Sequence, residues 1–241
     1  MRAEPGLSKR VSLERLRRLG LRPATIFDVG VATGTPELYG VFPDAKYALI
    51  EPLTESWPFM QKVLDSHPGS VAVQAAAGRA SGEGRLVVSP NLSGSSFILS
   101  PKSGEARAVP IVTIDEVVLA HALPGPYLLK LDVQGYELEA LAGAEATLGQ
   151  TCAIIAEVSL WGDKKRAGMA ELLPLMSWLR ERGFVLYDIA QIVRRELDDA
   201  ITEMDLVFCP SDSPLRRNTS YKSGQQAEAV TEKRRRAFGL S

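Results

Sequence analysis

Four acidic residues lie at or just beyond the ends of hydrophobic segments that are typical of buried strands. They are Asp28, Glu51, Asp132 and Glu157. In an open parallel sheet, ligands bind outside the carboxyl ends of the strands, near the point where the strand order reverses. Carboxylates at that edge can accept hydrogen bonds and can take up a proton. We therefore expect these side chains to gather around one ligand site.

The turn after the first strand spans residues 28–34 and contains two glycines, Gly30 and Gly34. Glycine lets the backbone approach a ligand closely. The turn lacks the full Gly-x-Gly-x-x-Gly spacing of dinucleotide-binding folds, and Asp28 would repel a pyrophosphate. The same acid suits a ligand with an ammonium group, such as the methionine moiety of S-adenosylmethionine. An ordinary glycine turn is the competing interpretation.

Glu51 follows the second strand, 23 residues after Asp28. This is close to the roughly 20 residues that separate the glycine turn from a ribose-binding acid in nucleotide-binding folds. A nicotinamide enzyme would use such an acid as well, so Glu51 does not distinguish the two cofactors. After the third strand, Ala76 lies among small residues at 75–78 that leave room for an adenine ring.

Asp132 and Glu157 follow the fourth and fifth strands. If these strands are neighbours, the two carboxyl groups face each other, and the pKa of one of them rises until it becomes a usable base. The pair could also hold a divalent cation, or Asp132 could simply cap the next helix. We expect both histidines, His67 and His121, at the surface, which leaves the carboxylates as the candidate bases.

Strands and helices alternate along the chain, which predicts an α/β domain with a mostly parallel sheet and helices on both faces. A short polar connection between the last two strands predicts an antiparallel edge hairpin. Asp205 interrupts the last apolar strand, and we expect it at the strand edge. The predicted strands are 25–29, 47–50, 71–76, 127–131, 153–157, 184–189 and 204–209. The predicted helices are 8–19, 35–41, 57–65, 111–119, 137–148 and 169–182.

The predicted domain organisation has three parts. Residues 1–22 form an N-terminal helix, and residues 23–210 form the main domain, in which 78–110 is a hairpin or flap insertion. Residues 211–241 are polar and are expected to be a mobile tail with a helix at 225–237. The flap and the region around Trp161 are expected to select the substrate.

Composition narrows the functional classes. Hydrophobic residues make up 45% of the 241 residues, which is enough for a sizeable core. A net charge of −1 creates no field that favours nucleic acid or an anionic membrane, so we expect a small-molecule or glycan partner. No apolar run reaches the roughly 20 residues of a membrane span. The two cysteines indicate reduced core thiols, and we expect a cytoplasmic protein.

Taken together, these segments resemble the FkbM family of methyltransferases. The most specific stretch is 130–144, which follows the pattern Lys-hydrophobe-Asp-hydrophobe-Glu/Gln-Gly-x-Glu and continues into a Leu-x-Gly-Ala helix. The resemblance covers about residues 20 to 210 and also includes 26–34, 50–52, 112–116 and 156–158. It implies the class I methyltransferase fold with a seven-stranded sheet, S-adenosylmethionine as methyl donor, and O-methylation of sugars, glycolipids or secondary metabolites.

The resemblance also implies roles for individual residues. Asp28, Gly30 and Gly34 would form the loop on the methionine side of the cofactor, and Glu51 would hold the ribose. Asp132 and Glu157 would lie at the methyl-transfer site. The sequence departs from the family in the first loop, where many members have a polar residue at the position of Ala32. There Thr33 would supply the missing polar contact.

Three rival functions remain at the level of sequence. A nicotinamide-dependent oxidoreductase would need the absent third glycine. A non-catalytic binding module would not need all four acids. An N-methyltransferase would often carry an Asn-Pro-Pro-Tyr type of segment after the fourth strand, and this chain does not.

Overall fold

The computed structural model describes residues 2–3, 7–89, 92, 94–97, 104–160, 172–220 and 224–238. The chain divides into two compact units, residues 1–211 and residues 212–241. The first unit contains the sheet and all of the predicted site residues.

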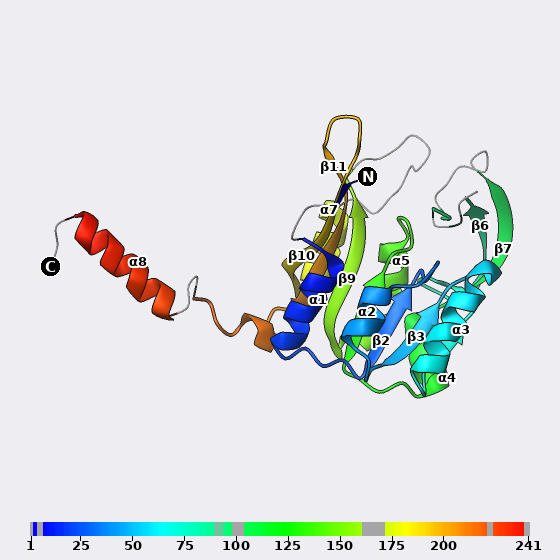
Figure 1. Ribbon diagram of the computed structural model, residues 1–241. Helices are drawn as coiled ribbons and strands as arrows, with labels where there is room; N and C mark the ends of the chain where they lie inside the picture. The colour runs from blue at the N-terminus through cyan, green and yellow to red at the C-terminus, as the bar shows by residue number, and fades with distance from the viewer. Residues whose placement is uncertain are drawn as a thin grey trace. The chain divides into compact units, whose positions relative to one another are not determined.

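The first unit is built on an eight-stranded sheet of order β1-β10-β11-β9-β8-β2-β3-β4 (Figure 1). The five strands from β9 to β4 are parallel, whereas β11, β10 and β1 are antiparallel. The expected seven-stranded, mostly parallel sheet with an antiparallel edge hairpin is confirmed, and the two-residue β1 extends that edge. The strands are β1 Arg2–Ala3, β2 Thr25–Val29, β3 Lys46–Ile50, β4 Val71–Val73, β8 Tyr127–Leu131, β9 Thr151–Ser159, β10 Phe184–Arg194 and β11 Ile201–Pro210.

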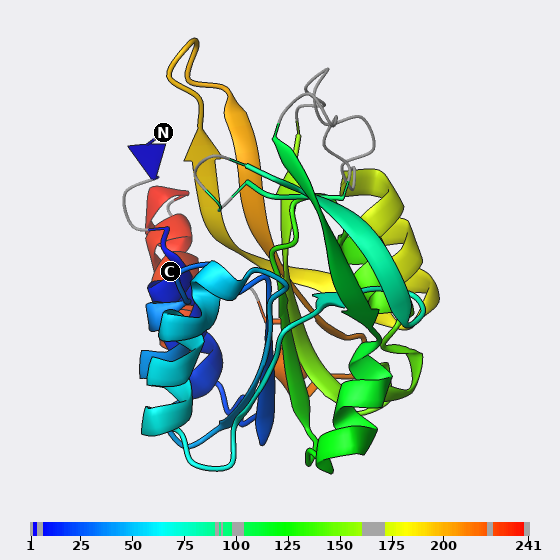
Figure 2. The same cartoon turned by 90° about the vertical axis from the view of Figure 1, so that its right-hand side faces the viewer.

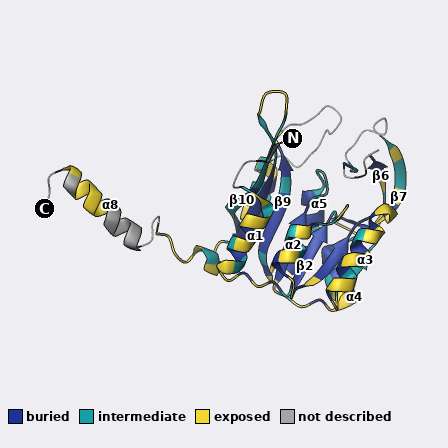
Figure 3. Ribbon diagram, viewed as in Figure 1, coloured by how far each residue is buried: buried dark blue, intermediate teal, exposed yellow. Residues whose placement is uncertain are grey.

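Helices cover both faces of the sheet. Figure 2 shows the sheet between a layer that contains α1, α2 and α3 and a layer that contains α4, α5 and α7. The strands are therefore buried from both sides, and every residue of β2 and β8 is buried (Figure 3). The helices are α1 Lys9–Arg18, α2 Pro36–Val41, α3 Trp57–Ser66, α4 Ile114–His121, α5 Glu137–Ala142, α6 Glu145–Leu148 and α7 Leu172–Glu181.

One predicted helix, 137–148, is in fact two helices that are separated at Gly143. A Cβ atom at this position would lie 2.1 Å from the carbonyl oxygen of Gly78. Only glycine therefore fits at this point between α5 and α6. A capping box begins α4: the Thr113 side chain accepts from the backbone N–H of Glu116, and the Glu116 side chain accepts from the backbone N–H of Thr113.

A second, three-stranded sheet is formed largely by the predicted insertion, together with the residues that flank it. It has the order β5-β7-β6, with β5 Ala76–Ala77, β6 Gly82–Val88 and β7 Glu105–Val112. The antiparallel pair β6–β7 is the expected hairpin. The predicted strand 71–76 is wrong in one respect, because β4 ends at Val73 and Ala76 belongs to the second sheet. Residues 90–91, 93 and 98–103 of the insertion, and Trp161, lie outside the described residues.

Two expectations about single residues are wrong. Asp205 lies inside β11, only 6% exposed, because its strand runs between β9 and β10 and an ion pair with Lys9 satisfies its charge. His67 is also buried, and its ring packs against Tyr47 with ring centroids 4.7 Å apart. His121 is exposed as expected.

The second unit holds the short helix η3 Pro214–Arg216 and the helix α8 Gly224–Ala237. Over the described part of the chain, no helix combines the length and apolarity that a membrane crossing requires. Both cysteines are free thiols, Cys209 buried and Cys152 half-buried.

Candidate active site

A cavity of about 500 Å³ opens at the carboxyl ends of the central strands. Its volume lies within the range of small-molecule sites. Of the eight site residues predicted from sequence, seven line this cavity: Gly30, Thr33, Gly34, Glu51, Ala76, Asp132 and Glu157. The topology thus brings together side chains that are spread over more than 120 residues of sequence.

Gly30 makes the first turn possible. Its φ angle is +78°, and a Cβ atom there would lie 2.0 Å from the carbonyl oxygen of Asp132. The end of β8 therefore packs directly against the backbone of the turn. The N–H of Asp132 donates to Val29 across this contact, at 3.0 Å. Only glycine allows β2 and β8 to end side by side in this way.

Glu51 organises the neighbouring turn. It is 5% exposed, and its two carboxylate oxygens accept hydrogen bonds from the N–H groups of Ala32, at 2.9 Å, and Leu53, at 3.0 Å. Burial raises the pKa of Glu51, and these two N–H groups oppose that change. A carboxylate has about four lone-pair sites, so Glu51 can accept further hydrogen bonds from a ligand in the cavity.

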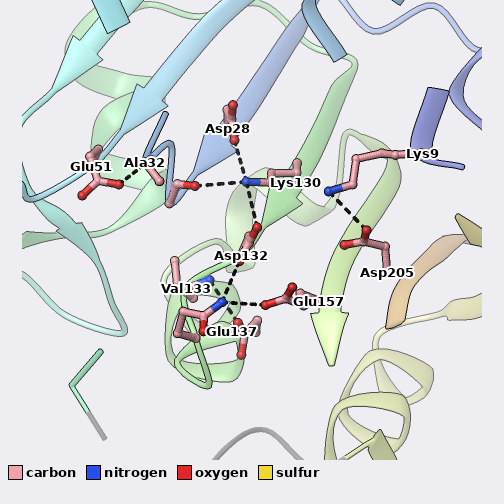
Figure 4. A network of polar contacts seen from close by, with 12 residues as sticks. Lys9, Asp28, Ala32, Glu51, Lys130, Asp132, Val133, Glu137, Glu157 and Asp205 are labelled. Atoms are coloured by element: carbon pink, nitrogen blue, oxygen red, sulfur yellow. Dashed lines mark hydrogen bonds and ion pairs between the residues drawn. The ribbon is translucent and has the colours of Figure 1, made fainter. Parts of the chain in front are cut away.

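Asp28 is the one predicted site residue that does not line the cavity. It is fully buried, accepts a hydrogen bond from Tyr39 and forms an ion pair with Lys130 at 3.0 Å (Figure 4). Its charge is therefore directed into the protein and not toward a ligand, and its position indicates that it supports Lys130. Asp28 lies on β2, directly opposite Lys130 on the neighbouring parallel strand β8.

Lys130 connects the turn to Asp132. Its ammonium nitrogen donates to the carbonyl oxygen of Gly30 at 3.0 Å and lies 3.6 Å from a carboxylate oxygen of Asp132. Burial would lower the pKa of Lys130, but Asp28 and Asp132 outweigh it and raise the pKa. The side chain is therefore a fixed positive charge beneath the cavity.

Asp132 and Glu157 do face each other, as expected, and Gln134 joins them. The amide nitrogen of Gln134 donates to Asp132 at 3.1 Å and to Glu157 at 2.7 Å. Burial, and then the neighbouring Asp132, raise the pKa of Glu157 to about 10. Burial would also raise the pKa of Asp132, but the positive charges of Lys130 and Lys9 hold it below its usual value. Of the two acids, Asp132 is therefore the one whose surroundings favour the ionised form, and Glu157 is the one whose surroundings favour the protonated form.

The interpretation of Asp132 as a helix cap is not supported. The next helix, α5, begins at Glu137, and its N-cap residue is Tyr136, which makes no side-chain cap. Asp132 lies several residues upstream, in the loop that crosses the cavity. Among the described residues, no group of three or more histidine, cysteine, aspartate or glutamate side chains is arranged to hold a metal ion.

Sequence reasoning overlooked Glu137, although it lies inside the most specific stretch of the resemblance. It is 1% exposed, and one of its oxygens accepts from the N–H groups of Val133, at 3.0 Å, and Gly135, at 3.2 Å. Burial raises its pKa to about 7. Glu137 folds the loop so that Gln134, at a φ of +54°, reaches between the two acids. In the sequence, the feature that could have identified Glu137 is its position two residues after Gly135.

The side of the cavity near the insertion carries two aromatic rings. Phe97 and Tyr136 both line the cavity, with ring centroids 4.8 Å apart and planes inclined by 37°. Lys9 and Glu203 line it as well, and neither was predicted from sequence. Aromatic faces beside carboxylates suit an organic ligand with apolar and hydrogen-bonding parts.

Comparison with known proteins gives one family match. The model of the methyltransferase FkbM domain matches residues 28–186. No curated protein matches the chain at a significant level.

Solved structures resemble the chain at low sequence identity. The magnesium protoporphyrin IX methyltransferase of Synechocystis PCC 6803, crystallised with bound SAM, has 14% identity and a TM-score of 0.47, over 84% of this chain and 78% of that chain. A putative O-methyltransferase of Klebsiella pneumoniae has 10% identity and a TM-score of 0.46, over 84% and 79%. The 23S rRNA methyltransferase ErmE has 15% identity and a TM-score of 0.44, over 94% and 75%.

Proposed function

The chain belongs to the methyltransferase FkbM domain family, and from this premise we propose that it is an S-adenosylmethionine-dependent methyltransferase that acts on a hydroxyl group. One observation carries the second half of the proposal. Asp132, whose pKa two lysines hold below its usual value, lines the same cavity as Glu51, so a candidate proton acceptor and a candidate nucleotide-binding group share one site.

The residues present fit S-adenosylmethionine. Glu51 has acceptor capacity directed at the cavity and suits the hydroxyl groups of a ribose. Ala76 and Leu53 offer a small apolar surface that suits an adenine ring. Gly30 and Thr33 line the same cavity, and in this proposal they hold the methionine portion. When bound, the cofactor supplies an electrophilic methyl group.

The part of the protein in the reaction is to position the acceptor and to remove its proton. Methylation of a hydroxyl group needs a base, and Asp132 is the ionised carboxylate of the pair. Glu157, whose pKa is raised, is linked to Asp132 through the amide of Gln134, which donates to both carboxyl groups and so holds Asp132 in place. No step of this account needs a metal ion. The acceptor class that we propose is a hydroxyl group of a sugar, glycolipid or secondary metabolite.

Calorimetric titration with S-adenosylhomocysteine tests the cofactor half of the proposal. The wild-type chain should bind it, and Glu51→Gln should weaken the affinity about tenfold or more, since hydrogen bonds to a charged group contribute about 1.5–3 kcal/mol. Glu83→Gln is the matched control, because Glu83 is exposed and lies on β6 away from the cavity lining. NAD should not bind. Binding of NAD in place of S-adenosylhomocysteine would favour an oxidoreductase, and binding of neither would favour a non-catalytic module.

Transfer of a labelled methyl group tests the acceptor half. A panel of methyl glycosides and phenols, matched with the corresponding amino compounds, is incubated with methyl-labelled S-adenosylmethionine. Label in the hydroxyl compounds supports O-methylation. Label confined to the amines would show that the enzyme is an N-methyltransferase.

A further inference from the structure

A row of carboxyl groups crosses the sheet on the acceptor side of the cavity. Asp132 follows β8, Glu157 lies on β9, and Asp205 lies on β11 directly opposite Glu157 in the antiparallel register. Directly opposed residues of an antiparallel pair project from the same face of the sheet. Glu203, two residues before Asp205, lines the cavity too. This row places several acids within one partly dry site, where their mutual repulsion must be offset.

Two lysines flank the row, and they differ in origin. Lys130 lies beneath the end of the row at Asp132 and belongs to the stretch that matches the family. Lys9 pairs with Asp205 at 3.2 Å at the other end and comes from α1 (Figure 4). Both Lys9 and Asp205 lie outside residues 28–186, which the family model matches. The second counter-charge is therefore a feature of this chain beyond the family segment.

The fold holds Lys9 at the cavity wall. It is the first residue of α1, directly after the N-cap Ser8, whose side chain accepts from the backbone of Val11. One turn further on, Ser12 and Arg15 bind the carboxylate of Asp188 on β10, at 2.9 and 2.7 Å. Leu13 and Leu16 are buried under the same helix. This anchoring leaves the Lys9 side chain only 16% exposed, with its ammonium group on Asp205.

We propose that Lys9 is a positioning residue of this active site. Asp205 holds the ammonium group of Lys9 beside the carboxyl row. There its positive charge keeps Asp132 the ionised acid that faces the acceptor. The proposal rests on the methyltransferase function proposed above. It makes the N-terminal helix a part of the active site and not only a cover for the sheet.

The charged groups around Asp132 come from every element packed against it. Lys130 on β8 and Lys9 on α1 favour its ionised form, and the hydrogen bonds from Glu157 and Gln134 favour it too, against its burial. In addition to burial, the charge of Asp132 in turn raises the pKa of Glu157, Asp205 and Glu137. Asp28 faces Lys130 on the side away from the cavity. Removal of Lys9 takes away one of the two lysines that favour the ionised form of Asp132, so protons should bind to Asp132 more readily.

The test is a pH titration of the Asp132 carboxyl carbon by ¹³C NMR in the full-length chain, with the signal assigned from Asp132→Asn. In Lys9→Gln, which keeps a hydrogen-bond donor for Asp205 but loses the charge, the midpoint should move to higher pH than in the wild type. In Lys9→Arg, which keeps the charge, it should return to the wild-type value. Arg10→Gln is the matched control, because Arg10 is half exposed and, among the residues that the structure describes, its ion pair is with the exposed Glu14. An unchanged midpoint in Lys9→Gln would overturn the proposal.

A second comparison applies if Lys9→Gln fails to fold because the buried Asp205 has lost its ion-pair partner. Asp205→Asn removes that charge, and adding Lys9→Gln to it should still raise the Asp132 midpoint. Equal midpoints in these two variants would also overturn the proposal. Calorimetry with S-adenosylhomocysteine on the wild type distinguishes this failure from failure of the proposed function, because the titration needs neither cofactor nor acceptor.

Discussion

Lys130 is the side chain whose loss should disturb the site most. Its side chain is 4% exposed and lies between the fully buried Asp28 and the carboxylate of Asp132. Lys130→Met keeps most of the volume but removes the only cation that contacts both acids among the described residues. Loss of one partner from a buried ion pair costs about 3–5 kcal/mol, because the remaining charge is left without compensation. For a chain of this size that corresponds to a fall in melting temperature of about 10 °C.

Urea unfolding followed by circular dichroism measures this cost. The matched control is Arg79→Met, which breaks the ion pair with Glu139 at the surface and should leave the free energy of unfolding nearly unchanged. The double variant Asp28→Asn/Lys130→Met should recover part of the loss, because it no longer buries the Asp28 charge. A loss below about 1 kcal/mol in Lys130→Met would refute the reasoning that this pair is dry and essential.

Three further predictions follow from the cavity. Asp132→Asn should lower turnover by about 10²-fold or more, the scale of a lost general base, and leave the affinity for S-adenosylhomocysteine intact; equal turnover would remove Asp132 from the mechanism. Glu137 has a folded pKa of about 7 against its usual 4.5, so its contribution to stability is complete below pH 4.5 and is lost as the pH rises through 7. Denaturation from pH 4.5 to 8 should therefore show Glu137→Gln gaining on the wild type by up to about 3 kcal/mol, whereas parallel curves would disprove a buried, titrating acid. Gly30→Ala should abolish binding of S-adenosylhomocysteine, because the added Cβ atom would collide with the backbone of Asp132. Gly20 also has a positive φ but open space around it, so Gly20→Ala is the control and should bind normally. Equal binding by both variants would show that the close backbone contact at Gly30 is not required.

The sheet and its ligand edge could be predicted because their signals are local. The central strands are short apolar segments. Because helices bury both faces of these strands, each strand must be apolar along its length, and such segments can be recognised in the sequence. The acids at or near the carboxyl ends of the strands then fall at one edge of the sheet by topology alone, which is why Glu51, Asp132 and Glu157 could be placed in one site. The sequence also predicted that one acid of the pair would have a raised pKa, but not which one. The choice depends on Lys130 and Lys9, whose positions are set by tertiary structure.

The features that could not be predicted are those that depend on contacts between distant segments. Asp28 looked like a ligand-binding acid because nothing in its own segment shows that Lys130 neutralises it from the adjacent strand. Asp205 looked like a residue of a strand edge because its partner, Lys9, lies almost 200 residues away. The need for glycine at position 143 also depends on a distant segment, because the backbone of Gly78 passes close to it.

A crystal structure of the complex with S-adenosylhomocysteine tests the central claim most directly, namely that this cavity holds the methyl donor. The account predicts that the ribose hydroxyl groups lie within hydrogen-bond distance of the Glu51 carboxylate, and that the sulfur atom faces Asp132. Ligand bound outside the cavity, or ribose contacts that do not include Glu51, would contradict it.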